Sequence, residues 1–118
     1  MSTLLIFNRE PYDGTDVTWN GLRLAKQLHK DGEQAWIFLM NDAVDMARDS
    51  CVRPENYDQD LAQMLRDLIA DGVPVKACGT CIARCGIYRN QPYFAGVETS
   101  TMAELSELVR SSVRVLGF

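Results

Sequence analysis

The sequence predicts an α/β fold, a three-layer sandwich in which helices cover both faces of a mostly parallel five-stranded sheet. Apolar runs of strand length alternate with helical patterns along the chain, which favours parallel strands joined by right-handed crossovers. The run at 35–40 is uninterrupted, as in a strand buried on both faces. A length of 118 residues suits one domain, here 1–118, with a core of its own.

Five segments account for the predicted strands. The first two are the apolar runs 3–8 and 35–40, and the third is 73–77. A fourth, short strand is expected within 86–97. The last strand, 113–118, closes the chain.

The first two connections each contain a predicted helix cap. Thr15 or Asp16 caps a helix that runs to about Lys30, and Gly21 on its inner face lets it approach the sheet closely. After the second strand, a short helix over 43–49 is expected, with Asp42 as its cap.

Three further helices complete the prediction. The clearest spans about 58–70, where apolar residues keep helical spacing. A short helix is expected from Gly79 to about Cys85. Thr101 and Glu104 match a capping box that opens the last helix.

Charge and hydropathy exclude several classes of protein. The net charge is −4, with acids and bases interspersed, so no basic stripe for nucleic acid is present. No apolar run approaches the ~20 residues of a membrane span, and the first apolar run is too short for a signal peptide. We therefore expect a cytoplasmic protein that binds neither membranes nor nucleic acid directly. In a reducing compartment, its four cysteines favour catalysis or metal binding over disulfides.

Three of the four cysteines lie within eight residues, directly after the third predicted strand. Cys78 ends that strand where a helix begins, and the unpaired N–H groups there favour thiolate, the reactive form. Cys81 completes a C-x-x-C pair, a spacing shared by redox, zinc and sulfur-transfer sites. Cys85 follows one helical turn later, where a disulfide to Cys81 would distort the helix. A sulfur-handling site with Cys78 as nucleophile is expected here; burial as a small apolar residue is the alternative.

A metal site is the main competing interpretation of this cluster. Three thiolates fall one short of the four ligands that zinc or an iron–sulfur cluster normally takes, so Cys51 would have to join. His29, the only histidine, lies late in the first helix and is expected to face water or the helix end. We expect no metal and no cofactor. Asp42 and Asp45 resemble paired carboxylates, but capping and surface solvation are the expected roles.

Polar residues that follow the strands are expected to shape the site, because parallel strands place their carboxyl ends at one edge of the sheet. Lys76 either adds positive charge there or is a solvated side chain. The residues expected to bind substrate are Asn8, Tyr12, Asn41, Gly79 and Thr80.

The chain resembles the DsrE/DsrF-like family, and within it the YchN-like branch, over nearly its whole length. The resemblance rests on Asn8 with Pro11-Tyr12, on the run 38–44 with Asn41-Asp42, and on Val73-Pro74-Val75-Lys76 leading into the C-x-x-C pair. Gly86-Ile87 continues the match. It implies a parallel five-stranded sheet, a homotrimer or homohexamer, and a role in sulfur metabolism.

The resemblance also implies roles for two cysteines. Relatives carry sulfur as a persulfide on a cysteine that matches Cys78, and Cys81 matches a second cysteine of the YchN-like branch. No family role carries over to Cys85, which is at most an accessory residue. We therefore expect a sulfurtransferase-like carrier that exchanges sulfur with donor and acceptor proteins. A non-catalytic partner subunit, a metal or cluster module and a thiol–disulfide oxidoreductase remain alternatives.

Overall fold

A computed structural model describes residues 2–118, and within them one five-stranded, wholly parallel sheet has the order β4-β3-β2-β1-β5. This confirms the predicted α/β class. The strands are β1 (Ser2–Phe7), β2 (Gln34–Leu39), β3 (Val75–Cys78), β4 (Val97–Ser100) and β5 (Arg114–Gly117).

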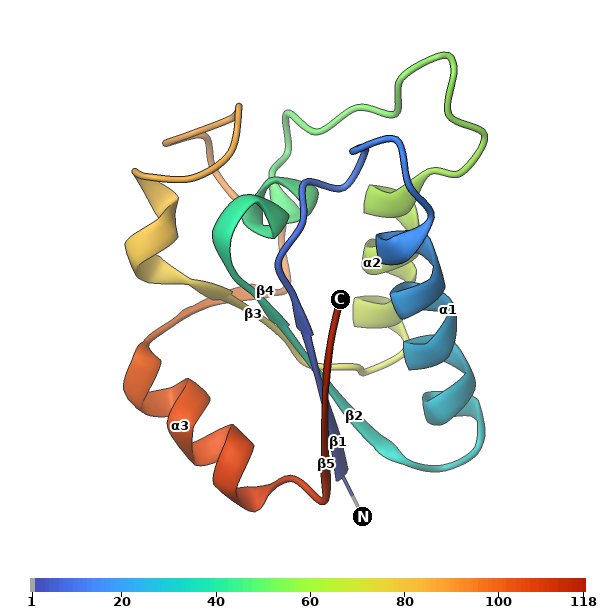
Figure 1. Cartoon of the computed structure of the whole chain (residues 1–118), viewed down its shortest axis with the longest axis vertical. Helices are drawn as coiled ribbons and strands as arrows, with labels where there is room; N and C mark the ends of the chain where they lie inside the picture. The colour runs from blue at the N-terminus through green and yellow to red at the C-terminus, as the bar shows by residue number, and fades with distance from the viewer. Residues whose placement is uncertain (1) are drawn as a thin grey trace.

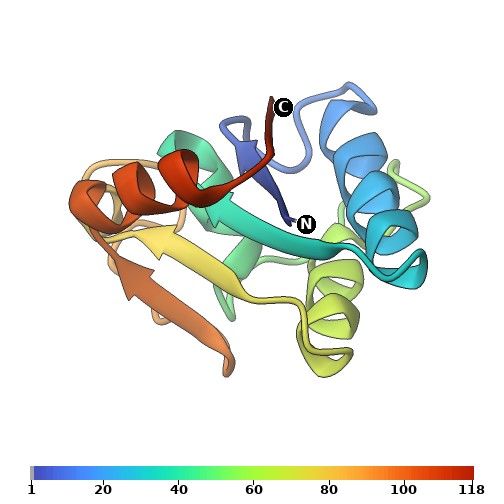
Figure 2. The ribbon, with the colours of Figure 1, turned by 90° about the horizontal axis from the view of Figure 1, so that it is seen from below.

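Helices cover the sheet unequally. Figure 1 shows the sheet edge-on, with α1 (Val17–Lys30) and α2 (Leu61–Ala70) on one face and α3 (Met102–Ser111) alone on the other. Figure 2 shows the same division from below. Two 3-10 helices, η1 (Asn41–Ala47) and η2 (Gly79–Ile82), follow β2 and β3. They lie at the carboxyl edge of the sheet, where the loops gather (Figure 1).

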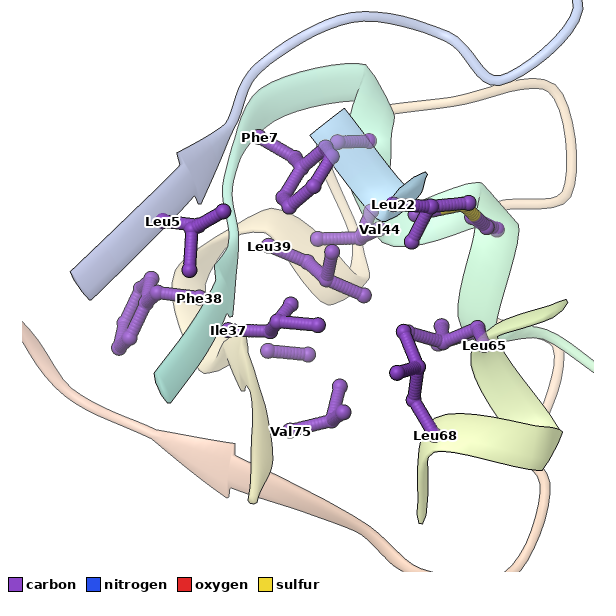
Figure 3. Close-up of a cluster of buried hydrophobic side chains, with 14 of the residues drawn as sticks. Leu5, Phe7, Leu22, Ile37, Phe38, Leu39, Val44, Leu65, Leu68 and Val75 are labelled. Carbon is purple, nitrogen blue, oxygen red and sulfur yellow. The ribbon is translucent and has the colours of Figure 1, made fainter. Parts of the chain in front are cut away.

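The core lies between the sheet and the α1–α2 layer. Alternate strand residues face it, and their side chains meet those of the two helices in Figure 3. Gly21 is needed here, because a Cβ at this position would overlap the ring of Phe7. The close approach of α1 to the sheet that Gly21 predicts is therefore present. The labelled core side chains on this face include Leu5, Phe7, Leu22, Ile37, Leu39, Leu65, Leu68 and Val75.

The predicted caps are only partly realised. The Thr101 hydroxyl accepts from the Glu104 N–H at 3.2 Å, but the Glu104 carboxylate turns to Ser100 and Lys76 instead of completing the box. Asp16 is the N-cap of α1, but its carboxylate accepts no hydrogen bond from the first turn of the helix. The helix α2 begins three residues later than predicted, where the Asp60 carboxylate accepts from the Gln63 N–H.

The short elements differ most from prediction. The helix expected at 43–49 is instead the 3-10 helix η1, with Met40 at its N-cap, so the prediction of Asp42 as its cap is wrong. The Asp42 carboxylate instead accepts a hydrogen bond from the Gly86 N–H at 3.1 Å. The helix expected to reach Cys85 ends at Ile82, and β4 begins only at Val97.

Candidate functional site: a cluster of three thiols

The three clustered cysteines lie at the carboxyl edge of the sheet. Cys78 is the last residue of β3 and pairs in register with Ser100 of β4. Cys81 lies in η2, and Cys85 follows in a turn whose Cys85 N–H donates to the Cys81 carbonyl at 3.0 Å. The fold thus holds three thiols within one strand end and the turns that follow it.

Cys81 is the common neighbour of the other two thiols. The thiols of Cys78 and Cys85 contribute to the raised pKa of the Cys81 thiol, and the Asn41 backbone acts in the opposite direction. Burial, followed by the contact with Cys78, raises the pKa of Cys81 to about 12. Cys81 therefore holds its proton at neutral pH. All three thiols are free in this structure.

The cluster becomes more open along the chain. Cys78 is 6% exposed and Cys81 is 8% exposed, whereas Cys85 is half-buried. A reagent from solution therefore meets Cys85 before the other two in the isolated chain.

The turn that carries Cys85 is anchored to η1 by two carboxylates. Asp42 accepts from the Gly86 N–H, and Asp45 accepts from the Ile87 N–H at 2.7 Å and the Tyr88 N–H at 3.2 Å. Gly86 has a φ of +84°, and a Cβ there would collide with the Asp45 carboxylate. Only glycine lets the backbone approach this carboxylate so closely.

Arg48 anchors the same segment from within the protein. Its fully buried guanidinium donates to the carbonyls of Ile82 at 3.0 Å and Gln91 at 2.6 Å. Its Nε lies 3.5 Å from Asp45 Oδ1, and its guanidinium carbon lies 4.9 Å from the ring centroid of Tyr93. Arg48 thus holds both ends of the segment 82–91 and Asp45 holds its middle, and we call this pair the clamp.

The sequence analysis did not predict that Asp45 and Arg48 are buried and paired. Asp45 was expected at the surface, which is wrong: it is 1% exposed, because the segment 86–88 closes over it. The available signal was two charged residues, three apart, inside the apolar stretch Ala43-Val44-Asp45-Met46-Ala47-Arg48. Opposite charges at that spacing can pair within one helical turn.

Four of the five predicted substrate-binding residues lie at the edge that carries the thiols. Asn41 Nδ2 donates to Asn8 Oδ1 at 3.1 Å, and Asn41 has a left-handed backbone with a φ of 51°. Gly79 and Thr80 begin η2 directly after Cys78, and Thr80 is exposed.

Tyr12, the fifth, is engaged elsewhere. Its hydroxyl accepts from the Leu61 N–H at 3.1 Å, at the start of α2, and its ring packs edge-on against Tyr57. It lies near Cys51, since that thiol contributes to the raised pKa of Tyr12.

Cys51 has different surroundings from the three clustered cysteines. It is buried in the core, and burial together with Asp45 and Asp60 raises the pKa of its thiol to about 12. Among residues 2–118, no three or more His, Cys, Asp and Glu side chains are placed to hold a metal ion.

Lys76 is neutralised by two glutamates. Its Nζ lies 2.8 Å from Glu98 and 3.4 Å from Glu104, and the hydrogen bond with Glu98 leads the contacts that raise the pKa of Lys76. It lines a groove of about 610 Å³ beside α3, together with Trp36 of the neighbouring strand β2. Its charge is therefore already paired.

Comparisons with known proteins agree with this architecture. Protein YchN of Escherichia coli K12 is 37% identical over 117 residues, covering 98% of this chain and 97% of that protein. An uncharacterized Methanopyrus kandleri protein, MK0008, is 30% identical over 116 residues, covering 97% and 91%. A crystal structure of the E. coli ychN protein has a TM-score of 0.80 at 35% identity and covers both chains fully.

The described helices contain none long and apolar enough to cross a membrane. The model of the DsrE/DsrF-like family, a family linked to sulfur relay, matches residues 1–118. With this match over the full length and the YchN relatives beside it, the chain belongs to the DsrE/DsrF-like family.

Proposed function

We propose that this protein is a sulfur carrier that holds sulfane sulfur as a persulfide on Cys78. The observation that carries the proposal is the place of Cys78 as the last residue of β3, with Cys81 following in η2 at the carboxyl edge of the sheet. Sulfur-relay chemistry needs a cysteine that accepts sulfur and surroundings that control its release. The family's link to sulfur relay supports the same function.

The carrier cycle consists of two exchanges. The Cys78 thiolate attacks the outer sulfur of a donor persulfide, the donor S–S bond breaks, and the donor leaves as a thiolate. An acceptor thiolate then attacks the outer sulfur of Cys78–S–SH, and Cys78 leaves as a thiolate. One sulfur atom moves in each step, with no net oxidation or reduction.

Cys81 sets how long the persulfide survives. Its thiolate would attack the inner sulfur of the Cys78 persulfide, expel hydrosulfide and leave a Cys78–Cys81 disulfide. With a pKa of about 12, only about one Cys81 in 10⁵ is a thiolate at pH 7. The loaded state is therefore long-lived at neutral pH, and the disulfide forms slowly.

The surrounding groups complete the proposed site. The backbone at Gly79 and Thr80 and the amides of Asn8 and Asn41 bind the sulfur-bearing group of donor or acceptor. Tyr12 does not bind the sulfur-bearing group itself. Its hydroxyl accepts from the Leu61 N–H and so holds the start of α2 in place.

Loading with a low-molecular-weight persulfide tests the function. After incubation with glutathione persulfide and alkylation of the reduced protein, we expect one extra sulfur atom on the Cys78 peptide by mass spectrometry. Cys78→Ser should abolish stable loading, and Cys81→Ser should prolong it. Cys51→Ala is the matched control, because that buried thiol lies outside the cluster.

Other outcomes identify the alternatives. An unmodified, folded protein would support a non-catalytic partner subunit. A protein that forms a Cys78–Cys81 disulfide with ordinary oxidants and never holds sulfane sulfur would be an oxidoreductase, an alternative that the C-x-x-C spacing favours. Stoichiometric zinc or iron in freshly purified protein would support a metal module.

A further inference from the structure

Cys78 lies on the face of the sheet that carries α3. Successive residues of a strand point to opposite faces, and Val75 of β3 faces the core on the α1–α2 side in Figure 3. Lys76 and Cys78 therefore point to the other face. The ion pair between Lys76 and Glu98, at 2.8 Å, joins residues that are in register on β3 and β4, and it confirms that their side chains share this face.

Ser100 is the neighbour of Cys78 on the α3 face. The two residues are in register across β3 and β4, so their side chains point the same way. Neighbouring strands lie about 4.8 Å apart. A persulfide lengthens the Cys78 side chain by about 2 Å, the length of a sulfur–sulfur bond, so its outer sulfur can reach the Ser100 hydroxyl. Because Ser100 is only 3% exposed, water competes little for that hydroxyl.

Glu104 fixes the direction of the Ser100 hydroxyl. Ser100 Oγ donates to Glu104 Oε1 at 3.1 Å, and the same carboxylate oxygen lies 3.4 Å from Lys76 Nζ. With its proton given to the carboxylate, the Ser100 oxygen offers only lone pairs to Cys78. Lys76 also pairs with Glu98, so the charged groups that β3, β4 and the first turn of α3 place here leave one negative charge.

We propose that Ser100, held by Glu104, keeps the outer sulfur of the Cys78 persulfide protonated, which is the form that an acceptor thiolate can attack. The inference rests on the proposed carrier function and adds to it two residues that control transfer. Ser100 Oγ accepts a hydrogen bond from the S–H group of Cys78–S–SH, and the carboxylate behind it disfavours a persulfide anion. Ser100 thus touches the reacting sulfur, whereas Glu104 acts through Ser100 as a positioning residue.

The protonation of the outer sulfur decides which reaction the persulfide undergoes. The anion Cys78–S–S⁻ is itself a nucleophile and repels an incoming thiolate. In the neutral form, the acceptor thiolate attacks the outer sulfur, the bond to Cys78 Sγ breaks, and Cys78 leaves as a thiolate. The proton stays on the transferred sulfur, so the acceptor becomes a persulfide with no net oxidation or reduction.

Two reagents with opposite requirements test the roles of Ser100 and Glu104. The full chain is loaded with glutathione persulfide, freed of donor and divided at neutral pH. Iodoacetamide alkylates the persulfide anion, which mass spectrometry of the Cys78 peptide follows. Cyanide removes the outer sulfur of the neutral persulfide as thiocyanate, which is measured as its iron complex.

Ser100→Ala and Glu104→Gln should change the two reactions in opposite directions. Alkylation should become faster and thiocyanate formation slower. The ratio of the alkylation rate to the cyanide rate should rise about fivefold, the effect of one hydrogen bond. Glu104→Gln carries the test if Ser100→Ala does not fold.

Glu107→Gln is the matched control, because it removes an exposed carboxylate of α3 that does not accept the Ser100 hydroxyl. Its rate ratio should equal that of the unsubstituted protein, and thermal midpoints show whether each variant folds. If both rates rise together in Ser100→Ala and Glu104→Gln, the two residues only close the site and the inference is wrong. Unchanged rates would also overturn it, while the carrier function stands. If the unsubstituted protein holds no sulfane sulfur on Cys78, the function fails and the inference with it.

Discussion

At the scale of single residues, the three thiols differ through their surroundings. Cys81 lies between Cys78 and Cys85 in the sequence and is buried. Burial is the main cause that raises the pKa of its thiol to about 12. Cys85 lies beside exposed arginines on a turn. In the proposed carrier, a protonated Cys81 beside Cys78 keeps the persulfide loaded, because discharge to a Cys78–Cys81 disulfide needs the Cys81 thiolate.

Discharge of the persulfide should therefore depend on pH. Below a pKa of about 12, the thiolate fraction of Cys81 rises about tenfold for each pH unit. Once protein is loaded and freed of donor, hydrosulfide release should accelerate about tenfold from pH 7 to 8 and again from 8 to 9. A sulfide-selective electrode measures the rate.

Cys81→Ser is the control for this pH profile. It removes the attacking thiol, so the steep rise with pH should disappear while the loaded state persists. A rise that is equally steep without Cys81 would assign discharge to another group.

At the scale of elements, the clamp ties η1 to the segment 82–91. Arg48 and Asp45 bury opposite charges; Arg48 satisfies backbone carbonyls at both ends of that segment, and Asp45 accepts from two backbone N–H groups in its middle. Removing one member of a buried pair leaves the other charge uncompensated, which costs about 3–5 kcal/mol. The turn that holds Cys85 thus depends on two side chains from a distant part of the sequence.

Loss of the clamp should loosen the thiol cluster before it unfolds the sheet. We expect Arg48→Met to lower the free energy of unfolding by about 3–5 kcal/mol. Hydrogen exchange should speed up first in the amides of 82–91, and alkylation of Cys81 should accelerate, whereas the amides of β1 and β2 should keep their protection.

The double variant Arg48→Met, Asp45→Asn tests whether the two residues act as a pair. Because each single change strands a partner, the double change should cost clearly less than the sum of the singles. Additive losses, or exchange that rises evenly over the whole chain, would show that the residues stabilise the protein separately.

Some elements could be predicted from sequence because their signals are local. The uninterrupted run at 35–40 corresponds to β2, and Thr101 caps α3 through the Glu104 N–H. The short elements could not, since tertiary contacts decide them. Asp42 has a capping residue's position, yet its carboxylate is taken by Gly86, 44 residues away.

The candidate site, like the fold, could be predicted from the sequence only where its signals are local. The spacing of Cys78, Cys81 and Cys85 locates the thiols. Their order of exposure and the clamp depend on how the segment 82–91 folds back over η1, which no local pattern encodes. Tyr12 also shows the limit: it follows β1 as predicted, but the nearby start of α2 takes its hydroxyl.

At the scale of the whole molecule, one face of the sheet is incompletely covered. α1 and α2 share one face, whereas α3 alone lies on the other (Figure 2). Exposed apolar side chains remain on α3 and near the edge strand β5: Met102, Val109, Val113 and Val115. Val115 pairs in register with Leu4 and so extends the apolar α3 face of the sheet to its edge.

Such a surface is typical of a subunit contact, as expected for the homotrimer or homohexamer that the family resemblance implies. Light scattering coupled to size-exclusion chromatography should therefore give a mass of three or six chains. Val115→Lys places a charge in the apolar surface and should shift the mass toward a monomer, with the fold retained by circular dichroism.

Val52→Lys is the matched control, because Val52 is 71% exposed but lies in the loop between η1 and α2. It should leave the mass unchanged. If the unsubstituted protein is already a monomer, or if both lysine variants behave alike, the apolar surface on α3 and β5 is not the contact. Persulfide loading of the Val115→Lys variant then separates assembly from chemistry. A monomer that still loads Cys78 would show that one chain contains the whole sulfur site.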